Sequence, residues 1–186
     1  MLYGKRIRLR AIEREDLPRF VAWLNDPEVR RNLQLFQPLS LVQEEEWFKG
    51  ILQRSVEEQP LVIEIRTGES WQAVGDAGFF SIREADRTAE IGIFIGEKKF
   101  WGQGYGTEAM SLMLKHGFKE LNLNRIYLRV YETNLRGIRS YEKAGFKQEG
   151  RLRQDRFMDG KYIDVLLMSV LRSEWKEVES GGEKWV

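Results

Sequence analysis

The sequence predicts an α+β protein in which helices flank one mixed, mostly antiparallel central sheet. Segments that alternate polar and apolar residues, the period of a half-buried strand, are interspersed with segments of helical spacing. Their order is strand, two helices, three strands, helix, strand, helix and hairpin, without the regular strand–helix alternation of a parallel sheet. The 186 residues, 42% of them apolar, suit one folded domain. We expect this domain at residues 1–175 and a polar tail at residues 176–186.

The first half of the chain provides a strand, two helices and three further strands. Acidic residues open the first helix, which runs to Leu24. Ser40 and Gln43 have the spacing of a capping box at the start of the second helix. The run Glu44-Glu45-Glu46 is expected to be the solvated face of that helix. Strands are expected at residues 6–11, 61–66, 73–82 and 90–95, and the middle two form an antiparallel pair.

The second half of the chain begins with a glycine-rich turn at residues 102–107, which precedes an amphipathic helix. The apolar face of that helix leaves out His116, which we expect at the surface. Asn134 can cap the next helix, and Gly145 can end it in a left-handed conformation. Asp159-Gly160 predicts a hairpin turn near the end of the chain. One more strand is expected at residues 125–131.

Composition excludes several classes of function. The 30 basic and 29 acidic residues leave a formal net charge of +1, so no global field attracts nucleic acid or an anionic membrane. The absence of cysteine excludes disulfides and thiolate nucleophiles, and one histidine cannot build a zinc site alone. No apolar run approaches the length of a membrane span, and the first residues lack the apolar core of a signal peptide. We therefore expect a cytoplasmic protein with no metal site.

The glycine turn indicates a phosphate-binding site. Gly102, Gly104 and Gly106 stand at alternate positions before a helix. Because they lack side chains, the backbone can approach a polyanion, and the amides at the helix start can bind phosphate oxygens. A tight strand-to-helix turn without a ligand is the alternative, although such a turn rarely needs three glycines in five residues.

A dinucleotide is one alternative ligand for this turn. Residues 104–109 match the pattern G-x-G-x-x-A, and Glu132 follows the next strand, where a ribose-binding acid would stand. A dinucleotide-binding oxidoreductase is therefore an alternative function. However, six residues separate Ile95 from Gly102, whereas that motif follows its strand directly.

Two longer segments resemble the GNAT superfamily of acetyl-CoA-dependent N-acetyltransferases. Residues 91–95 with 100–109 look like its fourth strand and pyrophosphate loop, and residues 134–146 look like its next signature. Residues 149–153, with the segment around Asp159 and Asp164, resemble the branch that holds ribosomal-protein N-terminal acetyltransferases and spermidine acetyltransferases. The resemblance runs from about residue 7 to residue 171, and two motifs in the right order are more specific than either alone.

This resemblance implies a cleft for acetyl-CoA between the fourth and fifth strands of the GNAT fold, which splay apart after a bulge. Gly92 in mid-strand suits such a bulge or a close backbone approach. Trp101 stands where relatives carry Gln or Arg, and Gly137 where many carry Ser or Ala. The residues implied in cofactor binding are Phe94 and Ile95 through the backbone, Trp101, Gly102, Gln103, Gly104, Tyr105, Gly106 and Thr107 at the pyrophosphate, and Asn134 and Lys143.

The implied chemistry is attack of a neutral amine on a thioester, which needs a proton for the leaving thiolate. Tyr141 would be the general acid, because a phenol stays protonated at neutral pH. Glu90 would be the general base, with strand-edge solvation as the alternative role. For Tyr141 the alternative is packing of its ring, for Asn134 a helix cap and for Lys143 a solvated side chain.

The acceptor is expected to be a primary amine on a small molecule, a polyamine or a protein N-terminus. Arg151, Arg153 and Arg156 form a basic cluster that could meet an acidic acceptor or partner, or else be a solvated strand face. Dimers are common in the superfamily, so a homodimer is one expected assembly. A CoA-binding module without catalytic activity is a further alternative function.

Overall fold

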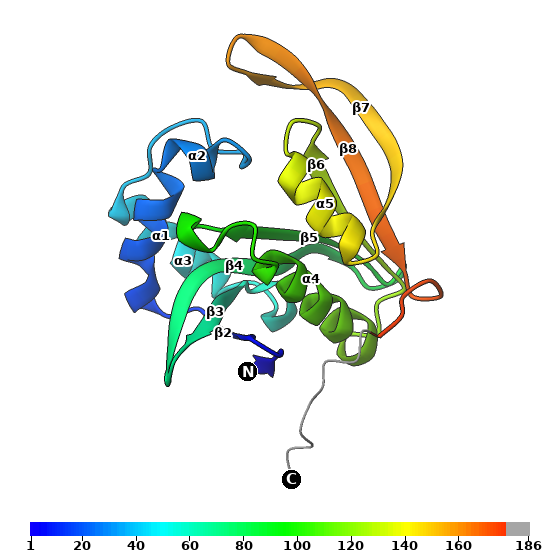
Figure 1. Ribbon diagram of the computed structural model, residues 1–186, viewed down its shortest axis with the longest axis horizontal. Helices are drawn as coiled ribbons and strands as arrows, with labels where there is room; N and C mark the ends of the chain where they lie inside the picture. The colour runs from blue at the N-terminus through cyan, green and yellow to red at the C-terminus, as the bar shows by residue number, and fades with distance from the viewer. Residues whose placement is uncertain (178–186) are drawn as a thin grey trace.

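One eight-stranded sheet organises the computed structural model, which describes residues 1–177. Neighbouring strands follow the order β1-β2-β3-β4-β5-β6-β8-β7 (Figure 1). The strands are β1 (Leu2–Tyr3), β2 (Ile7–Ala11), β3 (Leu61–Thr67), β4 (Ser70–Arg83), β5 (Thr88–Ile95), β6 (Arg125–Tyr131), β7 (Lys147–Met158) and β8 (Lys161–Leu171). The α-helices are α1 (Leu17–Leu24), α2 (Pro27–Arg30), α3 (Leu41–Ile51), α4 (Tyr105–Lys115) and α5 (Leu135–Lys143).

The predicted fold class is confirmed: the sheet is mixed, and its pairs are antiparallel except β5–β6 among the described strands. The capping box of Ser40 and Gln43 forms at the start of α3. Asp159 (φ 50°) and Gly160 (φ 77°) make the hairpin turn between β7 and β8, as a turn with two positive φ angles requires. Gly145 (φ 102°) follows the end of α5 in the left-handed conformation.

Two apolar clusters lie on the two faces of the sheet. Adjacent residues of a strand point to opposite faces, and Val62 and Ile63 of β3 accordingly belong to different clusters. The larger cluster includes Met110, Met113 and Leu114 of α4, and the smaller one joins α1, α2 and α3. Figure 1 shows α1, α2 and α3 gathered at one side of the molecule and α4 and α5 in front of the sheet. The two groups of helices leave the junction of β5 and β6 between them.

Strands β5 and β6 part soon after they begin. Their parallel pairing covers Thr88 to Glu90 on β5 and Arg125 to Tyr127 on β6, and it stops there. The edge of β5 that faces β6 therefore has no partner strand beyond Glu90. This confirms the splayed strands that the resemblance implied. The bulge expected at Gly92 is not found there: in the pairing of β4 with β5, the irregular register falls between Phe80 and Arg83 of β4.

Three sequence-based expectations are wrong. Glu44 does not share the solvated face of α3: it is 4% exposed, whereas Leu41 is 43% exposed. His116 is half-buried against the ring of Phe79, and burial lowers its pKa. Gly92 does not mark a bulge or a close approach of backbone. It accommodates the side chain of Phe80, since a Cβ at position 92 would lie 3.1 Å from that ring.

The boundary expected at residue 175 falls near the end of the described chain. Trp175 packs on Phe118 with ring centroids 5.4 Å apart, and Glu177 forms ion pairs with Lys115 at 3.0 Å and with Lys119. Residues 178–186 of the expected tail lie outside the described part. Within residues 1–177, no helix combines the length and apolar character that a membrane crossing needs.

Candidate active-site cleft

A cleft of about 910 Å³ opens where β5 and β6 part, a size typical of small-molecule sites. Its walls are β5, the glycine turn with the start of α4, the end of β6 with α5, and the segment at the end of α2. Every residue that the sequence analysis proposed for catalysis or cofactor binding lines this cleft, except Gln103. Gln103 instead supports the turn, because its side chain donates to the carbonyl of Lys99 at 2.7 Å.

The glycine turn uses its glycines for two different reasons. Gly102 (φ 74°) and Gly104 (φ 85°) adopt left-handed backbone, which side chains disfavour. Gly106 has no such constraint, and a Cβ there would make only ordinary contacts, 3.7 Å from Ser140 Oγ and 3.9 Å from Ile95 Cγ1. The protein alone therefore does not require glycine at position 106. A ligand that approaches the backbone closely would require it.

The start of α4 presents backbone amides to the cleft. The helix has 11 residues and begins at Tyr105, and no side chain in the described part of the chain caps it. The first N–H groups of a helix lack partners within the helix and carry its positive partial charge. Together with the open space over Gly106, this end of α4 is suited to a pyrophosphate.

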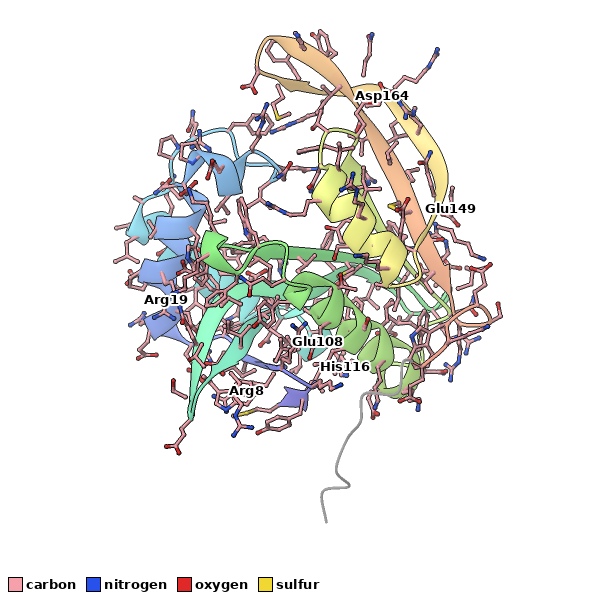
Figure 2. All side chains as sticks on the ribbon, viewed as in Figure 1. Arg8, Arg19, Glu108, His116, Glu149 and Asp164 are labelled. Atoms are coloured by element: carbon pink, nitrogen blue, oxygen red, sulfur yellow. The ribbon has the colours of Figure 1, made fainter. Side chains whose placement is uncertain are left out.

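Arg6 holds the glycine turn from the far side. Its Nε donates to Glu108 of α4 at 2.9 Å, and its Nη1 donates to the carbonyl of Gln103 at 3.1 Å. Its guanidinium also lies 4.6 Å above the ring of Tyr105. Figure 2 labels Glu108 in the first part of α4 and His116 further along. Arg6 is far from the turn in sequence, so no local pattern predicted this support.

Trp101 closes one side of the cleft without an exposed polar group. Its indole N–H donates to the carbonyl of Ile95 at 2.7 Å, which fixes the segment between β5 and the turn. The guanidinium of Arg136 from α5 lies 3.6 Å above the indole ring. Burial lowers the pKa of Arg136. The sequence analysis assigned Trp101 to the site but missed Arg136.

Tyr141 projects from α5 into the cleft. Its ring packs against the larger apolar cluster and lies 6.0 Å from the ring of Phe146. Burial raises the pKa of Tyr141 to about 12, because a phenolate loses hydration there. The hydroxyl therefore keeps its proton throughout the neutral range and can donate it.

Glu90 occupies the last paired position before β5 and β6 separate. Burial raises the pKa of Glu90, and this effect outweighs the opposing influence of Arg129 and of the hydroxyl of Tyr127. Arg129 Nε lies 3.6 Å from Glu90 Oε1, so the pair is loose. A carboxylate with a raised pKa is a stronger base than an ordinary glutamate.

Asn134 and Gly137 form the start of α5 together. Asn134 Oδ1 accepts from the N–H of Gly137 at 3.0 Å, which makes Asn134 a helix cap. A Cβ at position 137 would lie 2.5 Å from Asn134 Nδ2, which explains the glycine. The side chain of Lys143 is exposed at the edge of the cleft. Ser140 and Thr107 join α5 to α4 through their hydroxyls at 2.9 Å.

The fold contradicts the dinucleotide alternative. Such a site needs a parallel, doubly wound sheet, and this sheet has one parallel pair among the described strands. The carboxylate of Glu132 has a structural role and not that of a ribose-binding acid. It forms an ion pair with Arg151 at 2.9 Å and accepts a hydrogen bond from the N–H of Asp164 at 2.9 Å.

Known proteins are similar to this chain in fold and in sequence. A family model described as "Acetyltransferase (GNAT) domain" matches residues 6–147. The uncharacterized N-acetyltransferase p20 of Bacillus licheniformis is 32% identical over 94% of this chain and 97% of its own. The spermidine N(1)-acetyltransferase of Vibrio cholerae is 30% identical over 92% of this chain and 96% of its own. The crystal structure of spermidine N-acetyltransferase from Vibrio cholerae in complex with CoA and spermine matches with a TM-score of 0.83 at 28% identity, over 91% of this chain and 97% of that one.

The cleft and these similarities define the class of the protein, which is an acetyl-transferring enzyme. The chain belongs to the GNAT family of acetyltransferases. It is accordingly an N-acetyltransferase that uses acetyl-CoA.

Proposed function

We propose that the enzyme acetylates a primary amine by direct attack while donor and acceptor are both bound. The observation that carries this proposal is that one cleft brings together a phosphate-binding helix start, a strand edge without a partner, a carboxylate and a protonated phenol. These are the groups that acyl transfer from a thioester to an amine needs.

The donor would lie along the splayed strands. Gly102, Gly104 and Gly106 with the amides at the start of α4 would hold the pyrophosphate, and Lys143 adds a cation at the same edge. The free edge of β5 at Phe94 and Ile95 would bind the pantetheine arm. When bound, acetyl-CoA supplies the thioester that is the acyl donor.

Two side chains would handle the protons. Glu90 takes a proton from the attacking amine, directly or through water, because burial has raised its pKa. Tyr141 gives its proton to the departing sulfur, so CoA leaves as a thiol. The amine nitrogen gains the acetyl group and loses one proton, while the sulfur gains one proton.

The relatives named above include spermidine acetyltransferases, which makes a polyamine one candidate acceptor. A protein N-terminus and other small amines are the other candidates. The test is release of free thiol from acetyl-CoA in the presence of polyamines, peptides and aminosugars. We expect release that depends on one class of amine. Binding of CoA in a calorimeter without release against any amine would support the inactive CoA-binding module.

A further inference from the structure

Two neighbouring side chains, Tyr131 in the wall of the cleft and Arg156 beside it, each carry a buried polar atom without a hydrogen-bond partner. Among the described residues, the buried side-chain nitrogen and oxygen atoms that lack a hydrogen bond are His116 Nδ1, Tyr131 Oη and Arg156 Nε. The guanidinium carbon of Arg156 lies 5.4 Å from the ring centroid of Tyr131. An unpaired buried polar group costs about 1–3 kcal/mol, so a shared ligand would explain why both are present.

Tyr131 stands on the same face of the sheet as Glu90. Glu90 is paired with Tyr127 in the parallel register, and side chains two and four positions further along β6 point to the same face. Tyr131 is 6% exposed and lines the cleft. Tyr131 therefore lines the cleft on the same face as Glu90, four residues further along β6 than the partner of Glu90.

The guanidinium of Arg156 lies near two aromatic rings. Its guanidinium lies 4.1 Å from the ring centroid of Phe36, in the segment between α2 and α3, and Tyr131 is its other aromatic neighbour. A second link between the same segments is the ion pair of Arg31 and Asp159 at 3.4 Å. Figure 1 shows the end of the β7–β8 hairpin extending toward the side of the molecule that carries α2. Arg156 Nε can only donate, so its missing partner must be an acceptor atom such as oxygen.

The charge of the cleft disfavours a polycation. Glu90 is the one carboxylate among the residues that line it, and Arg129 already lies beside it. Several of the surrounding carboxylates are also paired within the protein, and the exposed Asp155, which acts on the pKa of Tyr131, is the exception beside Arg156. Asp26 and Glu28 bind Lys98, Glu132 and Asp164 bind Arg151, and Asp159 binds Arg31. The other charged residues that line the cleft are Arg129, Arg136, Arg139 and Lys143.

We propose that Tyr131 and Arg156 bind an oxygen of the acceptor, so the enzyme prefers a primary amine that carries a nearby carbonyl or carboxylate. This inference rests on the acetyltransferase function proposed above. A peptide with a free amino terminus has this chemistry, because its first carbonyl carbon is bonded directly to the carbon that bears the amine. A polyamine lacks it, since its protonated nitrogens only donate hydrogen bonds.

The test compares three acceptors with the full-length enzyme by thiol release. A dipeptide amide offers an amine and a carbonyl, propylamine offers the amine alone, and spermidine offers several amines. Because an α-amine with a pKa of about 8 is less protonated at neutral pH than an alkylamine with a pKa of about 10.4, kcat/KM is expressed per neutral amine. On this basis we expect kcat/KM for the dipeptide amide to exceed that for propylamine by about tenfold or more, the gain of one to two good hydrogen bonds. In Tyr131→Phe and Arg156→Met this ratio should fall toward one, chiefly through a higher KM for the dipeptide amide.

Matched controls separate recognition from general damage. Tyr162→Phe changes an exposed tyrosine on β8, and Arg153→Met changes an exposed arginine on the same strand as Arg156. Both should keep the wild-type ratio. A higher kcat/KM for spermidine than for the dipeptide amide would overturn the inference and leave the acetyltransferase intact. So would an unchanged ratio in Tyr131→Phe and Arg156→Met.

Binding measurements distinguish a failure of this inference from a failure of the proposed function. Absence of thiol release with all three acceptors would contradict the proposed function. In that case, the affinity of the CoA-bound enzyme for each acceptor, measured by calorimetric titration, still tests whether Tyr131 and Arg156 bind an oxygen of the acceptor. Binding of the dipeptide amide that weakens in Tyr131→Phe supports it. Equal binding by wild type and variant, or tighter binding of spermidine, overturns it.

Discussion

The guanidinium of Arg136 stacks on the indole of Trp101 at 3.6 Å and so joins the two walls of the cleft. Arg136 belongs to α5, which also carries Tyr141. Trp101 packs on the smaller apolar cluster, which includes residues of α1 and α2. The contact therefore fixes the separation between the wall that carries the proposed acid and helices α1 and α2.

A double-mutant cycle measures this contact. We expect Arg136→Met and Trp101→Leu to show a coupling free energy of unfolding of about 0.5–1 kcal/mol, typical of a cation–π pair whose arginine is exposed. Each single variant should also raise KM for the acceptor, since the walls lose their fixed spacing. Chemical denaturation of the four proteins gives the coupling. Additive effects of the two substitutions would show that the stacking contributes nothing.

The glycines of the turn can be separated by alanine substitution. Gly106→Ala should not destabilise the fold and should add up to about 1 kcal/mol of stability, because Gly106 lies in α4 with unstrained backbone and a Cβ has room. The same substitution should weaken CoA binding tenfold or more, because the Cβ occupies the space over the amides. Calorimetric titration with CoA measures this effect. Unaltered affinity would place the pyrophosphate elsewhere.

Gly104→Ala has a matched control in Gly68→Ala. Gly104 (φ 85°) and Gly68 (φ 65°) both require left-handed backbone, but Gly68 lies in the turn between β3 and β4. Both substitutions should destabilise the fold by about 1 kcal/mol through backbone strain. Only Gly104→Ala should weaken CoA binding. Equal CoA affinity in the two variants would show that strain alone explains Gly104.

Asp76 makes the stability of the fold dependent on pH. Burial raises the pKa of Asp76 from 3.8 to about 7, and the nearby Glu44 adds to the rise. Because the folded protein binds this proton more tightly than the unfolded chain, stability falls as pH rises from about 4 to about 7 and then levels off. Asp76→Asn removes the cost of ionisation and should stabilise the protein at pH 8 by roughly 1–4 kcal/mol.

Thermal unfolding between pH 5 and pH 8 tests this expectation. The wild type should lose stability across the range relative to Asp76→Asn, and part of the slope should remain because burial also raises the pKa of Glu44. Asp86→Asn, which changes an exposed carboxylate in an ion pair with Arg83, is the control. Parallel pH profiles for wild type and Asp76→Asn would contradict the prediction.

The sequence predicted the fold where local chemistry determines structure. The capping box of Ser40, the two positive φ angles at Asp159-Gly160 and the alternation along residues 125–131 depend on neighbouring residues only. It failed where partners come from distant parts of the chain. Glu44 has polar neighbours in sequence, yet tertiary packing buries it.

The candidate site shows the same division. The glycine turn and Tyr141 belong to contiguous motifs, so the sequence predicted them and the structure places them in one cleft. Arg6, Arg136 and Tyr131 acquire their significance from contacts across the fold. Alternation along β6 places Tyr131 on the same face as Tyr127, but only the register with β5 shows that Glu90 shares this face.

The central claim is that Tyr141 gives a proton to the sulfur of the bound donor, and Tyr141→Phe tests it most directly. We predict that kcat for thiol release falls by about 10²–10⁴-fold, while the calorimetric Kd for CoA changes little, because phenylalanine preserves the packing of the ring. Tyr162→Phe should retain the wild-type rate. A wild-type kcat in Tyr141→Phe would contradict the account and reduce Tyr141 to a packing residue.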